Sequence, residues 1–264
     1  LVGALHAFDT ETIIAPDYKH NSKLYTSFYN TLSSQNKEVT YPEVGQEYEF
    51  GEGSFTVLGP TQIRDDSNNN SVVVRLDYGD TSFLFTGDAE SKEEKDIIAA
   101  NEDLYCDVLS VGHHGSASST SWDFLEAVLP EYAVISCGVN NSYGHPDPDT
   151  IEKLESIEAQ IFRTDLQGNI IAISDGETIT WNNVPSNGEV LYAADFVSVK
   201  EEPNDTSSTV GELGPGNQIQ VLNRNDNDWA TIVFNGATTY IPSSYLSDID
   251  PQTMTQAAPT QPVG

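Results

Sequence analysis

The chain has 264 residues, of which 41 are acidic and 11 basic, so its formal net charge is −30. This charge argues against a protein that holds DNA or RNA on a basic surface, because such binding uses Lys and Arg to displace counterions from phosphate. The length suits about two domains of the usual ~100–200 residues, and the two cysteines imply no disulfide framework.

The predicted elements begin with a short apolar strand at residues 13–16 and a helix at residues 22–36, where apolar residues recur at helical spacing. Short β-rich runs, among them a strand predicted at residues 159–165, then alternate with amphipathic helices, which are predicted at residues 91–101, 121–129 and 149–157. Gly79-Asp80 supplies a tight turn between two such runs and predicts a hairpin. Hairpins together with strand-helix-strand units predict a mixed sheet and an α/β class.

The character of the sequence changes after Trp181, and we expect the first domain to span residues 1–182. Residues 183–189 are polar and rich in turn formers, which is typical of a linker. Residues 190–247 show short strands separated by Gly, Asn and Asp turns and no helix signal, which predicts a small all-β barrel. Residues 248–264 are rich in Pro, Thr and Gln and predict an unstructured tail or tether.

The sequence indicates neither a membrane segment nor a disulfide. No run reaches the ~20 apolar residues that span a bilayer, and no signal peptide is visible. Because the chain begins with Leu1, we expect a fragment or a processed product. Cys106 and Cys137 lie on separate predicted strands, and we expect both to be small buried side chains that do not pair.

Asp88 is the first residue with a candidate chemical role. It follows the apolar run at residues 83–87, and a carboxylate delivered at the end of a central strand is well placed to hold a cation. Asp is also a favoured helix N-cap, and a helix is predicted directly afterwards. Taken alone, Asp88 is more typical of the cap.

Three histidines also follow apolar strands. His113 and His114 come after the strand at residues 108–111 and precede Gly115-Ser116, while His145 lies between Gly and Pro. Imidazole is a common zinc ligand, but adjacent histidines point in different directions, so one of the two would enter a metal site. Each histidine alone is as well explained by an ordinary loop residue. Their shared placement after strands of one sheet favours a common site.

The order of these motifs resembles the metallo-β-lactamase-fold domain of ComEC-type competence proteins. The resemblance covers residues 1–182 and rests on the segments FLFTGDAE, VGHHGS, YGHPDP and FRTDLQG. It implies an αββα sandwich and a metal-dependent hydrolase, with DNA as the suspected substrate of the competence members. Metal ligands implied by the resemblance are Asp88 and His113. Residues implied to lie near the site or the substrate are His114, Ser116, His145, Asp165 and Asn70, the last within the polar stretch NNNS at 68–71.

The sequence departs from this family at its start. The family carries an H-x-[HD]-x-D-H signature that supplies most metal ligands and the residue that positions the attacking water. Here the chain begins with LVGAL, which is similar to the segment that follows the signature. We therefore expect the water-positioning residue and further ligands upstream of Leu1, and weak metal retention by residues 1–264.

Residues 190–247 resemble the bacterial SH3-like family. The resemblance rests on the segments VSVKEEP, VGELGPG and TTYIPSSYL. It implies that Trp229, Tyr240 and Tyr245 belong to the core. It also implies binding of cell-wall peptidoglycan and an extracellular or wall-associated location.

These observations combine into one functional hypothesis and its rivals. The hypothesis is a secreted phosphodiesterase or nuclease that uses one or two divalent metal ions, zinc or else manganese, and is tethered to the cell wall. The first rival is a non-catalytic wall-associated binding protein with a degenerate hydrolase domain. Another is a hydrolase of a cyclic nucleotide, a phospholipid or an ester. The net charge of −30 counts modestly against nucleic acid, although the acidity is itself more typical of solubility or a high-salt adaptation.

Overall fold

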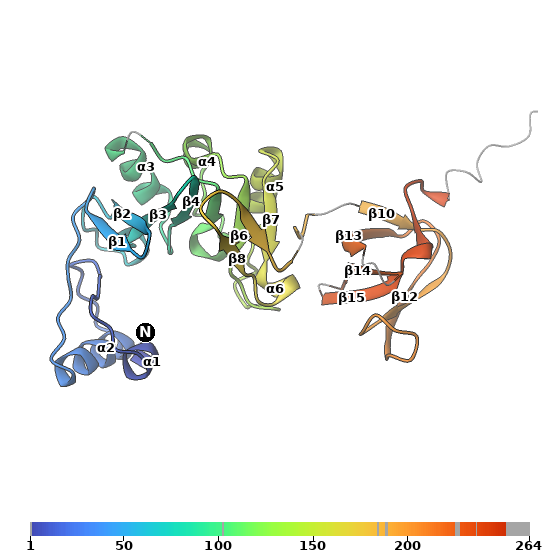
Figure 1. Ribbon diagram of the computed structural model, residues 1–264, viewed down its shortest axis with the longest axis horizontal. Helices are drawn as coiled ribbons and strands as arrows, with labels where there is room; N and C mark the ends of the chain where they lie inside the picture. The colour runs from blue at the N-terminus through green and yellow to red at the C-terminus, as the bar shows by residue number, and fades with distance from the viewer. Residues whose placement is uncertain are drawn as a thin grey trace, which may run out of the picture. The chain divides into compact units, whose positions relative to one another are not determined.

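The structure is a computed structural model that describes residues 2–101, 103–183, 185–187, 190–224, 228–235 and 237–251 (Figure 1). The chain divides into two compact units. The described residues of the first unit fall within 1–135, 145–159 and 174–179, and those of the second within 136–144, 160–173 and 180–264. The predicted linker therefore lies partly, and the predicted tail mostly, outside the described residues.

The N-terminal part of the first unit is helical. Helix α1 covers Val2–Ala7 and α2 covers Lys23–Ser34. Ser22 caps α2 by accepting a hydrogen bond from the Tyr25 N–H at 3.1 Å, as expected for a helix that begins after Ser. The strand predicted at residues 13–16 is wrong, because Ile14 makes an isolated bridge to Thr40. Pro16 has no N–H with which to extend this pairing.

The strands of the first unit lie in one sheet, where they follow the order β1-β2-β3-β4-β5-β6. Its strands are β1 (Glu47–Phe50), β2 (Gly53–Gly59), β3 (Val73–Tyr78), β4 (Thr81–Phe85), β5 (Val108–Ser110) and β6 (Tyr132–Ile135). The first four strands pair antiparallel, and the hairpin predicted at Gly79-Asp80 is confirmed by the pairing of β3 with β4. From β4 onward the pairing with β5 and β6 is parallel. The sheet is mixed, as the sequence predicts.

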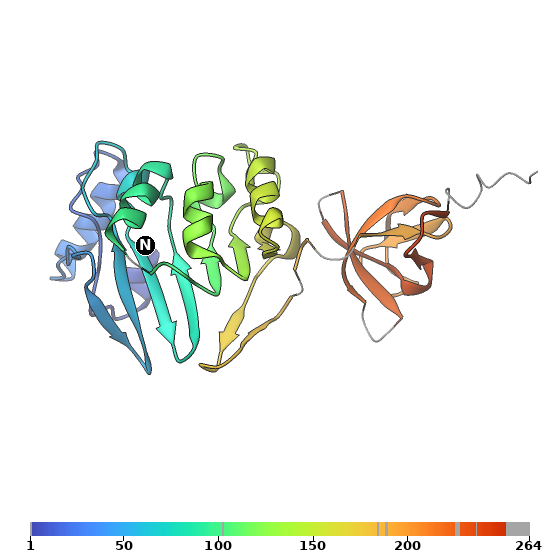
Figure 2. The ribbon, with the colours of Figure 1, turned by 90° about the horizontal axis from the view of Figure 1, so that it is seen from above.

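Three helices lie side by side on one face of this sheet (Figure 2). They are α3 (Ser91–Ala100), α4 (Trp122–Val128) and α5 (Pro148–Ser156), close to the predicted bounds. Their apolar faces and the sheet enclose fully buried side chains. Among these are Val57, Val73, Leu84, Ile97, Leu109, Phe124, Leu125, Ile135 and Leu154.

The first strand of the second unit is shorter than predicted. Strand β7 covers Gln160–Arg163, and Thr164–Gln167 form the single-turn helix α6 in place of a strand that reaches Asp165. The Gln167 side chain accepts a hydrogen bond from the Arg163 N–H at 2.8 Å, and this local bond ends the strand. A two-stranded hairpin follows, with β8 (Ala172–Ser174) and β9 (Ile179–Trp181).

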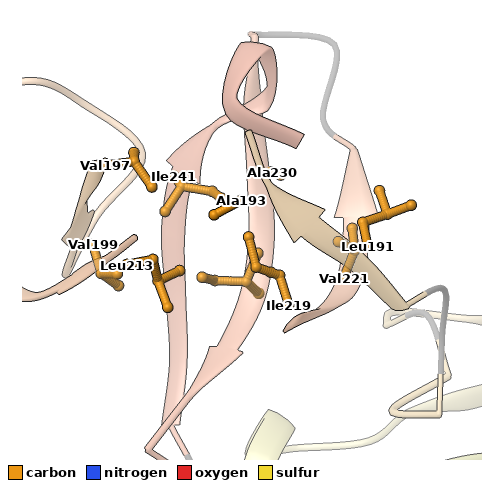
Figure 3. Packing of buried hydrophobic residues seen from close by; sticks show 10 residues of the cluster. Leu191, Ala193, Val197, Val199, Leu213, Ile219, Val221, Ala230 and Ile241 are labelled. Carbon is orange, nitrogen blue, oxygen red and sulfur yellow. The ribbon is translucent and has the colours of Figure 1, made fainter. Parts of the chain in front are cut away.

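The remainder of the second unit is all β. Its sheet has the strand order β12-β11-β15-β14-β13-β10-β16. The strands are β10 (Val190–Ala193), β11 (Val197–Lys200), β12 (Thr209–Leu213), β13 (Gln218–Arg224), β14 (Trp229–Phe234), β15 (Ala237–Pro242) and β16 (Leu246–Ser247). Side chains from several strands meet in one apolar cluster, among them Leu191, Val199, Leu213, Ile219 and Ile241 (Figure 3).

The aromatic residues expected in this core divide into two groups. Tyr245 packs against the cluster as predicted. Trp229 and Tyr240 are only half-buried. The side chains of a strand alternate between its two faces, and the neighbouring Ala230 and Ile241 are the residues that point inward. The prediction of a core position for Trp229 and Tyr240 is therefore wrong.

The cysteines are unpaired but differ in burial. Cys106 is fully buried, and this burial raises the pKa of its thiol to about 12. Cys137 is only half-buried, so the expectation of full burial is wrong for it. It lies two residues beyond Ile135, the last residue of β6. Burial and the carboxylate of Asp165 raise the pKa of its thiol to about 11.

Candidate functional site

The candidate residues of the first unit follow three neighbouring strands. Asp88 follows β4, His113 and His114 follow β5, and His145 lies beyond β6 in the chain. Because β4, β5 and β6 pair in parallel, their carboxyl ends share one edge of the sheet. The sheet topology therefore brings these four side chains toward one place.

Asp88 is held by a turn and not by a helix. Gly87 has a φ of 56°, a left-handed conformation that suits glycine, and the Asp88 N–H then donates to the Ser71 hydroxyl at 3.1 Å. Glu90 occupies the N-cap position of helix α3, without a capping bond from its side chain, so Asp88 is not the N-cap of this helix. The Asp88 side chain is 46% exposed, which leaves its carboxylate accessible.

The paired histidines have unusual backbone conformations. His113 has a φ of 48° and His114 a φ of 59°, and such left-handed angles are strained for residues that carry a Cβ. A hydrogen bond from the His113 N–H to the Gly87 carbonyl, at 2.9 Å, helps to fix this turn. The ring centroids of the two histidines are 6.2 Å apart, and the ring planes are tilted by 60°. The Nε2 atom of His114 lies 3.6 Å from Oδ1 of Asp88, so His114 is the imidazole that pairs with this carboxylate.

His145 joins the site through a close contact between two motifs. A Cβ added to Gly115 would lie 2.6 Å from the Cβ of Pro146, so the HHGS and GHP segments can pack only because Gly115 is a glycine. The Asp147 N–H also donates to the Gly115 carbonyl at 2.8 Å. In this arrangement the ring centroids of His113 and His145 are 5.8 Å apart. The candidate site thus includes His145.

Glu90 is a residue that the sequence analysis missed. Its carboxylate lies 3.3 Å from Nδ1 of His113 and accepts a hydrogen bond from the Ser118 hydroxyl at 3.0 Å. The side-chain amides of Asn68 and Asn69 each donate to it at 3.2 Å. The available signal was its place in the run GDAE, two residues after Asp88.

Asn70 and Ser116 occupy supporting positions. The buried Asn70 amide donates to the carbonyls of Arg64 and Asp66 and accepts from the Arg64 N–H at 2.7 Å, so it holds its own loop. The Ser116 hydroxyl, also buried, lies 3.0 Å from that of Ser118. Both residues therefore act on the candidate site indirectly, because they position neighbouring residues.

Helix α3 also carries two buried carboxyl groups. Glu93 accepts a hydrogen bond from the Ser71 N–H at 3.2 Å, and its burial raises its pKa to about 8. Glu94 accepts hydrogen bonds from the N–H groups of Thr120 and Ser121, and burial raises its pKa as well. The two carboxyl groups anchor the loops that carry the asparagines and the serines.

Asp165 belongs to the second unit. Its carboxylate forms an ion pair with Arg163 at 2.7 Å and is largely buried, with 13% of the side chain exposed. Locally it stabilises the turn that ends β7. Its predicted place near the site remains a prediction.

The side chains of the candidate site offer donor atoms of a kind that metals bind, but fewer of them than a catalytic metal site needs. Asp88 offers a carboxylate and His114 an imidazole, which are ligands that zinc accepts. A catalytic zinc site uses about three protein ligands. Within the part of the chain that the structure describes, no cluster of three or more His, Cys, Asp or Glu side chains could hold a metal ion. The described residues alone therefore do not make up a catalytic zinc site of this kind.

A mixed sheet covered by helices, with carboxylate and imidazole groups at the ends of its parallel strands, is typical of an α/β enzyme-like domain. Residues 3–139 match the family described as "Metallo-beta-lactamase superfamily", and the chain belongs to this superfamily. Residues 195–247 match the family described as "Bacterial SH3 domain". The predicted domain boundaries at 182 and 190 remain predictions.

The relatives of the chain include competence proteins. It is 38% identical over 117 residues to "ComE operon protein 3" of Bacillus subtilis (strain 168), covering 44% of this chain and 15% of that protein. It is 38% identical over 125 residues to "Competence protein ComA" of Neisseria gonorrhoeae, covering 47% of this chain and 18% of that protein. It is 32% identical over 168 residues to "Recombination protein 2" of Haemophilus influenzae, covering 63% of this chain and 19% of that protein. The chain thus spans less than a fifth of each relative. No helix among the described residues has the length and apolar character needed to cross a bilayer.

Proposed function

We propose that this chain is part of a metal-dependent phosphodiesterase, with DNA as the leading class of substrate. The observation that carries the proposal is the pairing of Asp88 with His114, 3.6 Å apart, where adjacent parallel strands end in a metallo-β-lactamase domain. The similarity to proteins named for competence and recombination favours DNA over a cyclic nucleotide, a phospholipid or an ester.

Each residue has a distinct place in this proposal. Asp88 and one imidazole of the HHGS segment would hold one or two divalent ions, zinc or else manganese. Such an ion would supply a bound water with a pKa of about 7 and a positive charge to polarise a phosphoryl oxygen. His145 lies beside His113 and faces the substrate. Further ligands are needed to complete the metal site, since the described donor set is too small.

The first test measures hydrolysis by the full-length gene product. The purified protein, supplied with zinc or manganese, is incubated with linear DNA and with a chromogenic phosphodiester. We expect metal-dependent hydrolysis that falls by about 100-fold or more in Asp88→Ala, because a metal-holding group is lost. Asp123→Ala, which removes an exposed carboxylate from α4, is the matched control and should keep the wild-type rate. Equal rates in wild type and Asp88→Ala would overturn the role of Asp88.

The SH3-like module suggests where the enzyme acts. We propose that residues 190–247 bind cell-wall peptidoglycan and hold the protein outside the cell or at the wall. The match to a bacterial SH3 family supports this location. Cosedimentation of the chain with purified sacculi tests it, and a chain that stays in the supernatant at every concentration would contradict it.

A second function is a non-catalytic, wall-associated binding protein. One observation favours it, namely that the described residues lack a group of three metal-binding side chains. In that case the full-length product should cosediment with sacculi yet hydrolyse neither substrate with zinc or manganese. Sequencing the gene upstream of Leu1 separates the two functions, because the binding protein would lack the histidine signature there.

A further inference from the structure

Glu90 lies among hydrogen-bond donors. Its Oε1 atom is 3.0 Å from the Ser118 hydroxyl, 3.2 Å from the Asn68 amide nitrogen and 3.3 Å from Nδ1 of His113. Its Oε2 atom accepts from the Asn69 amide at 3.2 Å. A carboxylate that carries no proton is an acceptor only. Three of these contacts share Oε1 and one falls on Oε2, so Glu90 faces nitrogen and hydroxyl groups at both of its oxygens.

The orientation of Asn69 follows from its other bonds. Its Oδ1 atom accepts a hydrogen bond from the Glu93 N–H at 3.1 Å, and a backbone N–H can only donate. The amide nitrogen must therefore face the carboxylates, where it donates to Asp66 at 2.8 Å and to Glu90. Glu90 is thus fixed as an acceptor by a neighbour whose amide cannot be flipped.

The same reasoning applies to His113. A neutral imidazole donates from one nitrogen and accepts at the other, and a carboxylate beside Nδ1 favours a proton on Nδ1. We propose that Glu90 is a positioning residue that holds His113 as the Nδ1–H tautomer, so that the lone pair lies on Nε2. A lone pair on Nε2 is what a metal ligand or a proton acceptor requires. The use of Nε2 as a metal ligand or proton acceptor rests on the proposed hydrolase function, whereas the assignment of the Nδ1–H tautomer does not.

One alternative arrangement competes with this one. The Ser118 hydroxyl lies 3.4 Å from Nδ1 of His113, and if it donated there, Nδ1 would be the acceptor and Nε2 would carry the proton. The hydroxyl lies closer to Glu90, at 3.0 Å, which favours donation to the carboxylate. The two arrangements predict opposite tautomers.

Nitrogen NMR of the histidine side chains distinguishes them. The chain is labelled with ¹⁵N-histidine and measured at about pH 8. Two-bond and three-bond couplings from the ring protons identify the protonated nitrogen. We expect His113 to be mostly Nδ1–H. His20 is an internal reference, because its Nδ1 accepts from the Ser22 N–H at 3.1 Å and should therefore give the Nε2–H pattern.

Variants separate the role of Glu90 from general damage to the loop. Glu90→Ala should shift His113 to mostly Nε2–H, and Glu90→Asp, which keeps the carboxylate, should restore part of the Nδ1–H signal. Asp66→Ala is the matched control. Asp66 also holds Asn69, through two hydrogen bonds of 2.8 and 2.9 Å, but has no such contact with His113. This control should leave the His113 pattern unchanged.

The outcomes decide the proposal independently of enzyme activity. An Nε2–H pattern for His113 in the wild type would overturn it, and so would an equal shift in Asp66→Ala and Glu90→Ala. An Nδ1–H pattern that depends on Glu90 alone would support it, even if the full-length protein hydrolysed no phosphodiester. That combination would overturn the proposed function and leave the positioning role intact.

Discussion

At the scale of single residues, Gly115 determines how two motifs meet. Its φ of 81° is a left-handed angle, and a Cβ here would approach that of Pro146 to 2.6 Å. We expect Gly115→Ala to lower the free energy of unfolding by about 2 kcal/mol or more, from backbone strain plus overpacking. Gly144→Ala is the control, because its φ of 75° carries the same strain while no atom lies within 4 Å of its Cβ. Urea unfolding of both variants measures the difference, and equal losses would contradict the packing role.

Glu93 predicts a dependence of stability on pH. Burial raises its pKa from the usual 4.5 to about 8 in the folded state, so folding favours the protonated form. The stability that this group supports is therefore fully present below about pH 4.5 and is lost as the pH rises through about 8. We expect Glu93→Gln to match the wild type near pH 5 and to exceed its free energy of unfolding by on the order of 2 kcal/mol near pH 9.

Urea unfolding at several pH values tests this expectation. The matched control is Glu126→Gln on α4, since Glu126 is exposed and water screens its charge. Its difference from the wild type should stay within about 0.5 kcal/mol at every pH. A Glu93→Gln difference that is constant from acid to alkaline pH would show that Glu93 does not titrate in this range.

The residues of the site were only partly predictable. Asp88, His113, His114 and His145 could be found because each follows an apolar strand, and strand ends are visible in a sequence. Glu90 could not be assigned in this way. Its contacts with His113 and Asn69 depend on the turn geometry at Gly87 and on loops far away in the chain. Such contacts have no local pattern.

At the scale of elements, β4 is central to the first unit, since it pairs antiparallel with β3 and parallel with β5. Leu84 in this strand is 0% exposed, and Phe85, on the opposite face, is 43% exposed. We expect Leu84→Ala to lower the free energy of unfolding by about 2–5 kcal/mol, because it leaves a cavity. Phe85→Ala should lower it by about 1 kcal/mol, since the ring is only partly buried. Denaturation of both variants gives the comparison, and similar losses would contradict the assigned faces.

Most elements were predictable because hydrophobic periodicity and caps are local. Helices α2, α3, α4 and α5 and the hairpin of β3 with β4 lie within a few residues of their predicted bounds. The strand predictions failed where local bonds or proline competed with the sheet, as at Arg163 and at Ile14. The half-buried positions of Trp229 and Tyr240 were missed because aromatic character alone does not tell which face of a strand is inside.

At the scale of the whole molecule, charge and proposed substrate oppose each other. The formal net charge of −30 repels a DNA polyanion, and ions in solution screen this repulsion. A DNA-binding protein with many Lys and Arg contacts to phosphate loses about 10³–10⁵-fold in affinity between roughly 50 and 200 mM salt. We expect the opposite here, with a KM for DNA that stays constant or falls over that range.

Initial rates of DNA hydrolysis by the full-length product at several NaCl concentrations provide the measurement. The control is an uncharged or singly charged phosphodiester, whose KM should change little with salt because it carries little charge to repel. A KM for DNA that rises steeply with salt would reveal basic contacts elsewhere in the protein, and the acidic surface would then not govern the encounter. A KM that falls for DNA alone would indicate that salt screens a repulsion between the acidic surface and the DNA.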